Sequence, residues 1–163
     1  MYQLKYMTEY FIDDFLPPPN ASKYFHLMRP KFGDGRVAGL AFEPVMAEHL
    51  NLEHTNEKFV DFRSRTERRF PIEMKGRTAA GIDFKASNTK GASRTFDREH
   101  WNETAIERDW LVVDVTRVLS SNRLHYMVLP GHEVFRIGPK LTPKQSAALF
   151  AEKHSGDCLV TCW

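Results

Sequence analysis

The run DWLVVDVTRV, residues 109–118, constrains the fold of this chain more than any other segment, because it is the most apolar stretch of the sequence. A strand that is apolar on both faces needs a covering layer on each side of its sheet, so this run is predicted to be a central strand. The preceding residues 95–108 are predicted to form a helix, with Thr95 as its N-cap and Asp97 in its first turn. A helix that leads directly into a central strand indicates an α/β fold.

Further helices and strands are expected on both sides of this pair. Helices are predicted at residues 1–16, 39–52 and 142–154, and strands at residues 58–63, 69–75, 81–87, 123–129 and 132–137. Thr142 is expected to cap the last helix, with Pro143 at its first position. The order of these elements predicts an α/β fold in which a mixed β-sheet is flanked by helices, built as a single domain over residues 1–163.

The composition is that of a soluble globular protein and gives no sign of a membrane span. Hydrophobic residues make up 42% of the chain and charged residues 27%, and the net charge is +2. No apolar run approaches the roughly 20 residues that a membrane span needs, and the N-terminal residues mix charged with apolar side chains, unlike a secretory signal. No Walker-type phosphate loop and no dinucleotide fingerprint occurs.

The two cysteines, Cys158 and Cys162, are too few for a disulfide framework, so we expect a reduced, cytoplasmic protein. His154 and the two cysteines recur at every fourth residue, which could gather zinc ligands on one face of a helix. Gly156 weakens such a helix, and no fourth ligand is evident. We therefore expect Cys158 and Cys162 to be small, reduced residues near the C-terminus rather than ligands of a zinc site.

A pair of short strands places two carboxylates and an amine on one face. Residues 58–63 and 69–75 alternate apolar and polar side chains, and SRTER joins them at a length that suits a hairpin. If the apolar residues of both strands face the core, then Asp61, Glu73 and Lys75 share the opposite face. The hairpin brings Asp61 opposite or diagonal to Glu73, within roughly 5–8 Å. This face is either a solvated surface or half of an active site.

Two carboxylates at this distance repel each other unless positive charge lies between them. Mg²⁺, for which Mn²⁺ could substitute, prefers oxygen ligands and keeps several waters, so one or two carboxylates can bind it. Such an ion polarises a phosphodiester and lowers the pKa of a bound water, while Lys75 could orient or deprotonate that water. Glu73 lies between apolar neighbours, where a charge without a role is costly. The sequence therefore predicts a metal site at Asp61 and Glu73.

The combination of Asp61, a hairpin and Glu73-Met74-Lys75 resembles the PD-(D/E)xK signature of the restriction-endonuclease-like superfamily. In that superfamily an Asp on one strand and an acid-x-Lys on the next together hold Mg²⁺ for phosphodiester cleavage. The resemblance extends over residues 39–118, and it implies a restriction-endonuclease-like sheet. It also implies that Asp61 and Glu73 are catalytic metal ligands and that Lys75 is the catalytic lysine.

The same resemblance implies a further acidic catalytic residue on the helix that precedes the hairpin. Glu43 is the match and Glu48 the fallback, although Pro44 leaves the position of Glu43 on its helix open. The sequence departs from the signature at Val60, which stands in place of the signature proline, a residue that is often missing in the superfamily.

A second acid-x-Lys triplet leaves the register of the signature open. Asp83-Phe84-Lys85 also lies on a predicted strand, and in that register Glu73 would be the first acid. The first register is favoured because it has an Asp in the first position and a hairpin of ordinary length between the two acids.

Polar and basic residues around the predicted site suit a DNA backbone and base edges. The residues expected to contact DNA are Arg77, Lys85, Asn88, Lys90 and Arg94. The predicted function is a Mg²⁺-dependent endonuclease acting on double-stranded DNA, of the type II restriction class, and a homodimer because one domain holds one site. The alternative is a non-catalytic α/β nucleic-acid-binding or interaction module, which would be indifferent to the metal.

Overall fold

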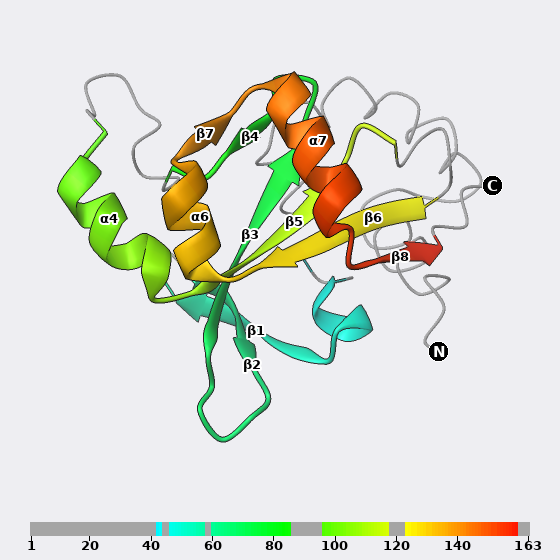
Figure 1. The fold of residues 1–163 in the computed structure, drawn as a ribbon. Coiled ribbons are helices and arrows are strands. Elements are labelled where there is room, and N and C mark those ends of the chain that lie inside the picture. Colours follow the sequence, from blue (N-terminus) through cyan, green and yellow to red (C-terminus); the bar gives the residue numbers. More distant parts are fainter. Residues whose placement is uncertain (1–41, 44–45, 58–59, 86–95, 118–122, 160–163) are drawn as a thin grey trace, which may run out of the picture.

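The computed structural model describes residues 42–43, 46–57, 60–85, 96–117 and 123–159. Within these ranges the chain forms a mixed α/β structure in which helices pack on a twisted sheet (Figure 1). The helix expected at residues 1–16 and the loop at residues 88–94 lie outside the described residues.

The main sheet has six strands in the order β1-β2-β3-β5-β6-β8. Neighbouring strands are antiparallel, except that β3 and β5 run parallel. The strands are β1 (Leu52–Glu57), β2 (Val60–Ser64), β3 (Pro71–Arg77), β5 (Asp109–Asp114), β6 (Arg123–Leu129) and β8 (Gly156–Leu159). A second, small sheet pairs β4 (Ile82–Asp83) with β7 (Lys140–Leu141).

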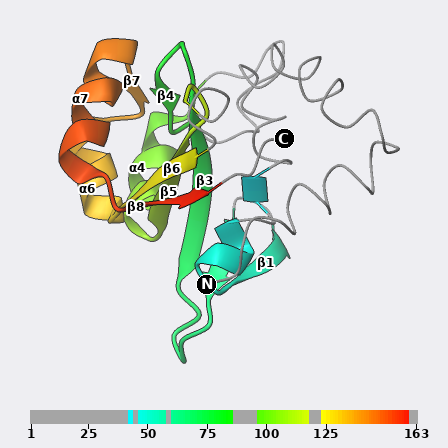
Figure 2. The same ribbon diagram turned by 90° about the vertical axis from the view of Figure 1, so that its right-hand side faces the viewer.

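Three helices cover one face of the main sheet, as Figures 1 and 2 show. They are α4 (Arg98–Ile106), α6 (Gly131–Ile137) and α7 (Pro143–Lys153). Trp101, Val134 and Phe150 from these helices join Trp110 and Met127 from the sheet in one buried cluster. Because Glu73 pairs with Trp110 across β3 and β5, Glu73 points to this helix-covered face.

The opposite face is covered by the helical residues 42–43 and 46–49, of which Phe42 and Met46 are buried. Figure 2 shows this short helix across the sheet from α7. Residues 110–113 of β5 are buried on both faces, which confirms the prediction of a central strand.

Local signals set the helix ends largely as the sequence predicts. Thr142 and Gln145 form a reciprocal capping box at the start of α7, and Pro143 occupies its first position, as expected. At α4 the prediction of Thr95 as cap was wrong, because the side chain of Asp97 caps the helix by accepting the free backbone N–H of His100. Asp97 competes better because its carboxylate also interacts favourably with the positive end of the helix dipole.

The strand predicted at residues 132–137 is instead helix α6. Its alternating side chains suit a strand, but Val134 and Ile137 also lie one helical turn apart and both pack against the buried cluster. Pro130 precedes the helix, and Gly138, at φ 94°, ends it in a conformation that favours glycine. Tertiary packing therefore decides between two patterns that this short segment fits equally well.

The helix predicted at residues 39–52 ends earlier than expected, and β1 begins at Leu52. Asn51 has φ 52°, a left-handed conformation that stops a helix and that Asn adopts more readily than other non-glycine residues. The sequence LEHTNE has little apolar character, so its strand depends on backbone pairing with β2. The strand expected at residues 81–87 shortens to β4, which leaves the main sheet and pairs with β7.

Candidate active site

The β2–β3 hairpin brings Asp61 and Glu73 together. The two strands pair Phe62 with Ile72, so the next pair in this register is Asp61 with Glu73. The backbone N–H of Met74 donates to Asp61 Oδ2 at 2.7 Å, which fixes the carboxylate of Asp61 against β3. The juxtaposition predicted from the hairpin is therefore present.

Glu73 is a buried carboxylate, and its side chain is only 6% exposed. Its Oε1 accepts a hydrogen bond from Lys75 Nζ at 2.6 Å, and the Lys75 side chain is 15% exposed. Its Oε2 has no hydrogen-bond partner, and among the described residues it is the one buried side-chain nitrogen or oxygen atom in that state. The interpretation of this face as a solvated surface therefore fails, because a carboxylate here loses most of its hydration.

Asp61 shares the electrostatic cost of this arrangement. Burial, and then the negative charge of Glu73, raise the pKa of Asp61 from its ordinary 3.8 to about 7, and Glu43 adds to the rise. The hydrogen bond from Met74 and the ammonium of Lys75 oppose the rise without cancelling it. Asp61 therefore lies where burial and a neighbouring carboxylate disfavour its negative charge, and a metal ion bound between the two carboxylates would favour that charge.

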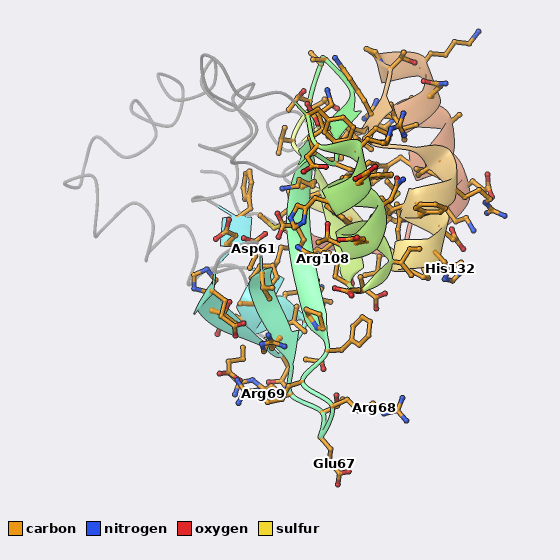
Figure 3. All side chains as sticks on the ribbon, turned by 90° about the vertical axis from the view of Figure 1, so that its left-hand side faces the viewer. Asp61, Glu67, Arg68, Arg69, Arg108 and His132 are labelled. Carbon is orange, nitrogen blue, oxygen red and sulfur yellow. The ribbon has the colours of Figure 1, made fainter. Side chains whose placement is uncertain are left out.

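Arg108 is a member of this site that the sequence reasoning missed. It follows α4 immediately before β5, and its Nη1 lies 3.6 Å from Glu73 Oε2. Its Nε donates to the carbonyl of Thr104, which anchors the guanidinium, and the side chain is 11% exposed. Asp61 and Arg108 lie on either side of β3 (Figure 3), because β2 and β5 are its two neighbours. The contact depends on the parallel pairing of β3 with β5, which brings Arg108, just before β5, close to Glu73. The sequence alone does not show this pairing.

Glu43 lies close enough to Asp61 to raise its pKa, but a partner already holds it. His54 on β1 contacts Glu43 Oε2 through Nε2 at 3.0 Å. The fallback, Glu48, is exposed. The structure thus places Glu43, rather than Glu48, near Asp61.

The second acid-x-Lys triplet is not assembled with Glu73. Asp83 lies in β4, in the small sheet, and its Oδ1 accepts the backbone N–H of Lys85. The Lys85 ammonium lies over the ring of Phe96. No contact joins either residue to Glu73 within the described part of the chain, so the geometry favours the first register.

Among the residues expected to contact DNA, Arg77 is engaged inside the fold. Its guanidinium is 12% exposed and bonds Asp114, Thr116 and Ser146, so it is not presented as a surface cation. Asn88, Lys90 and Arg94 lie outside the described residues.

The helix that would gather His154, Cys158 and Cys162 does not form. Helix α7 ends at Lys153, and Cys158 lies on strand β8, so helical spacing does not apply to these residues. Cys162 lies outside the described residues.

Comparison with family models, with curated proteins and with solved structures gave no match for this chain. Within the described ranges, no helix is long and apolar enough to cross a membrane. The same ranges contain no group of three or more His, Cys, Asp or Glu side chains placed to hold a metal ion. A cation at Asp61 and Glu73 would therefore have two carboxylates and would need water or substrate oxygens besides, which suits Mg²⁺ better than zinc.

Proposed function

We propose that this chain is a Mg²⁺-dependent endonuclease that hydrolyses phosphodiester bonds in double-stranded DNA, of the type II restriction class. The observation that carries the proposal is the buried carboxylate of Glu73, whose Oε2 has no hydrogen bond although Asp61, Lys75 and Arg108 surround it. A buried charge left in this state is costly, and such groups concentrate at functional sites.

The order of the elements supports a restriction-endonuclease-like core. A helical segment at residues 42–49 precedes three antiparallel strands, β1 to β3, and α4 then crosses over to β5, which runs parallel to β3. The PD-(D/E)xK signature implies a preceding helix, a hairpin, and a following helix and strand within residues 39–118, and β1 is an additional strand. The signature residues fall on the two central strands of that order, β2 and β3.

Asp61 and Glu73 fit a hard divalent cation, because they are neighbouring carboxylates shielded from water, and one oxygen of Glu73 has no hydrogen bond. When bound there, Mg²⁺ or Mn²⁺ would polarise the phosphodiester and lower the pKa of a water. Without a cation, the ammonium of Lys75 balances part of this charge.

Lys75 has the chemistry to act on the substrate directly. Its ammonium donates only to Glu73 among the described residues, and it retains two further N–H donors. A phosphate oxygen or an attacking water at the edge of β3 could accept these donors, which would orient the water and stabilise charge at phosphorus. Arg108 lies 3.6 Å from the other oxygen of Glu73 and is a positioning residue in this scheme.

The further parts of the proposal follow from the substrate. A single site cuts one strand, so cutting a duplex would use a homodimer with two-fold symmetry. DNA within the cell as substrate is consistent with a cytoplasmic protein.

The proposal is tested by digesting plasmid DNA with the purified protein in Mg²⁺ and in EDTA. We expect discrete fragments with Mg²⁺, no cutting in EDTA, and loss of cutting in Lys75→Ala. Lys144→Ala, which removes an exposed lysine of α7, is the matched control and should keep its activity. Lys85→Ala removes the lysine of the other triplet, which is also an expected DNA contact, and should weaken cutting at most without abolishing it. Asp61→Asn is a second variant that we expect to be inactive. It removes the charge of Asp61 and leaves no buried cation without a partner, so the variant should fold.

The outcomes separate the alternatives. Cutting that survives in Lys75→Ala but not in Lys85→Ala would transfer the site to Asp83 and Lys85. A smear in place of discrete fragments would keep a nuclease and remove the restriction class. Absence of cutting on varied DNAs with Mg²⁺ and Mn²⁺ would refute the proposal and favour a binding module.

A further inference from the structure

The turn between β2 and β3 extends beyond the sheet as a formed hairpin of residues 64–70, here named the hairpin arm. Residues 65–70 are all exposed. In Figures 1 and 2 the arm projects away from every labelled helix, and in Figure 3 Glu67 and Arg68 lie at its far end. Ser64 N–H donates to Phe70 O at 2.9 Å, and Phe70 N–H donates to Ser64 Oγ at 2.8 Å, so one backbone bond and one bond to a side chain close the arm.

Strand β1 braces the base of the arm through two ion pairs. Arg63 forms a two-point contact with Glu57, with distances of 2.7 and 2.6 Å, and Arg69 Nη2 lies 2.8 Å from Glu53 Oε1. These pairs neutralise two of the arginines in this region and hold the hairpin against the edge of the sheet.

Two other arginines are left without a carboxylate. Arg65 makes a single long contact of 3.4 Å with the carbonyl of Leu52. Arg68 is exposed and has no polar partner among the described residues. The remaining charged residue of the arm, Glu67, is also exposed, so the tip presents two unpaired cations and one anion to solvent. An exposed excess of arginine suits a polyanion, and Arg is well shaped to hold a phosphate.

The arm grows from the same two strands that carry Asp61 and Glu73. Phe70 lies three residues from Glu73, or roughly 10 Å along an extended strand, and the tip lies farther out. At 3.4 Å per base pair, this spacing corresponds to about three base pairs or more of duplex. A two-stranded ribbon also has the width that the major groove of DNA admits.

We propose that the hairpin arm binds the backbone of a DNA duplex along the major groove, about three base pairs or more from the site at Asp61 and Glu73. Arg65 and Arg68 are the contacting cations. The inference rests on the proposed function for the nature of the polymer that the site receives, but the contact itself needs no metal and no catalysis.

The experiment measures binding of a fluorescein-labelled duplex of about 30 base pairs, roughly three helical turns, by anisotropy in EDTA over a range of salt. Each phosphate contact contributes about 0.9 to the slope of log K against log salt. Arg65→Ala/Arg68→Ala should therefore reduce the magnitude of this negative slope by about 2. Binding at 0.1 M salt should weaken by on the order of 60-fold, and by a similar factor for duplexes of different sequence. Glu67→Gln should have the opposite effect and strengthen binding, because it removes the anion of the tip.

The matched control is Lys140→Ala/Lys144→Ala, which removes the same charge from exposed residues of β7 and α7 at the opposite end of the molecule (Figure 1). It should change the affinity only a few-fold and leave the slope nearly unaltered. Circular dichroism of all variants should match the parent, since every substituted residue is exposed.

The result separates the arm from the nuclease. An arm variant that binds like the parent overturns the inference, even if the parent cuts DNA. If the parent binds duplex through the arm but never cuts DNA, the proposed function is refuted and the inference about the arm still holds. A parent that shows no affinity for duplex at low salt overturns both.

Discussion

Asp61→Asn tests whether Asp61 is a desolvated carboxylate held against Glu73. The substitution keeps the shape of the side chain and an oxygen that can accept the Met74 N–H, but it removes the charge. Folded Asp61 ionises only near pH 7, whereas unfolded Asp61 ionises near its ordinary pKa of 3.8. Because the folded state binds the proton more tightly, the free energy of unfolding of the parent falls as the pH rises from about 4 to about 7, and it stays low above that.

The size of the effect follows from the pKa. A rise from 3.8 to about 7 corresponds to at most about 4.5 kcal/mol, at about 1.4 kcal/mol per pKa unit. The side chain is partly exposed, so we expect the Asn variant to be more stable than the parent by about 2–4 kcal/mol at pH 8. For a chain of this length, this corresponds to a rise in Tm of roughly 5–15 °C. At pH 4.5 the difference should largely vanish, because the parent is then protonated.

The assay is thermal unfolding in EDTA between pH 4.5 and pH 8.5, repeated with Mg²⁺. A ligand that binds only the folded protein adds RT ln(1 + [L]/Kd), which is about 1.4 kcal/mol at tenfold excess over Kd. Mg²⁺ should therefore raise the Tm of the parent at pH 8 and should have much less effect on the variant. The variant should also lose cleavage, so stability and activity should change in opposite directions.

Asp97→Asn is the control, because Asp97 is exposed and Asn caps a helix as well as Asp does. Its Tm should follow that of the parent at every pH. The reasoning is refuted if Asp61→Asn is no more stable than the parent at pH 8, or if its gain is the same at pH 4.5. Either result would mean that Asp61 is solvated or fully paired, as on an ordinary surface hairpin.

Three further substitutions test how the site is held, each by urea unfolding. Arg77→Met should lower the free energy of unfolding by about 3–5 kcal/mol, because it leaves the buried Asp114 without the ion pair to Arg77. A variant that stays stable but binds DNA more weakly would instead make Arg77 a DNA contact. Gly131→Ala should cost about 2–3 kcal/mol, because its Cβ would meet three carbonyl oxygens at the end of α4 at 2.4–2.6 Å, and an unchanged midpoint would contradict this packing. Arg108→Gln should cost about 1–3 kcal/mol in EDTA and less in Mg²⁺, because the cation then neutralises Glu73, and an equal loss in both conditions would separate Arg108 from the site.

The hairpin and its register were predictable from the sequence because both depend on local signals. Period-two alternation and a short connection suffice to put Asp61 opposite Glu73. The burial of Glu73 was not predictable, since it depends on β5 and α4, which begin more than twenty residues later in the chain. For the same reason no sequence pattern indicated Arg108.

The segments whose secondary structure was wrongly predicted are likewise those that depend on contacts distant in the sequence. Residues 132–137 fit a strand and a helix equally well, and contacts of Val134 decided for α6. The strand β1 has no apolar pattern of its own and forms because β2 offers it an unpaired edge. By contrast, Thr142 and Pro143 determine the start of α7 by their own chemistry, and that start was predicted correctly.

A comparison within β3 shows that the unsatisfied state of Glu73 is a local property of the site. Arg77 lies on the same strand and the same face, and it forms an equally buried ion pair with Asp114. There every group is satisfied: Arg77 also donates to Ser146 and Thr116, and Asp114 Oδ1 accepts two further hydrogen bonds.

Four residues earlier, at Glu73, the same sheet leaves an oxygen without a hydrogen bond and raises the pKa of a second carboxylate, Asp61. A fold that neutralises one buried charge completely is able to neutralise another, so the difference calls for a ligand rather than for poor packing. In the function proposed above, that ligand is a divalent cation between the two carboxylates, with its other coordination positions filled by water and a substrate phosphate. On this proposal, the stability of Asp61→Asn and its expected loss of cleavage report on one site.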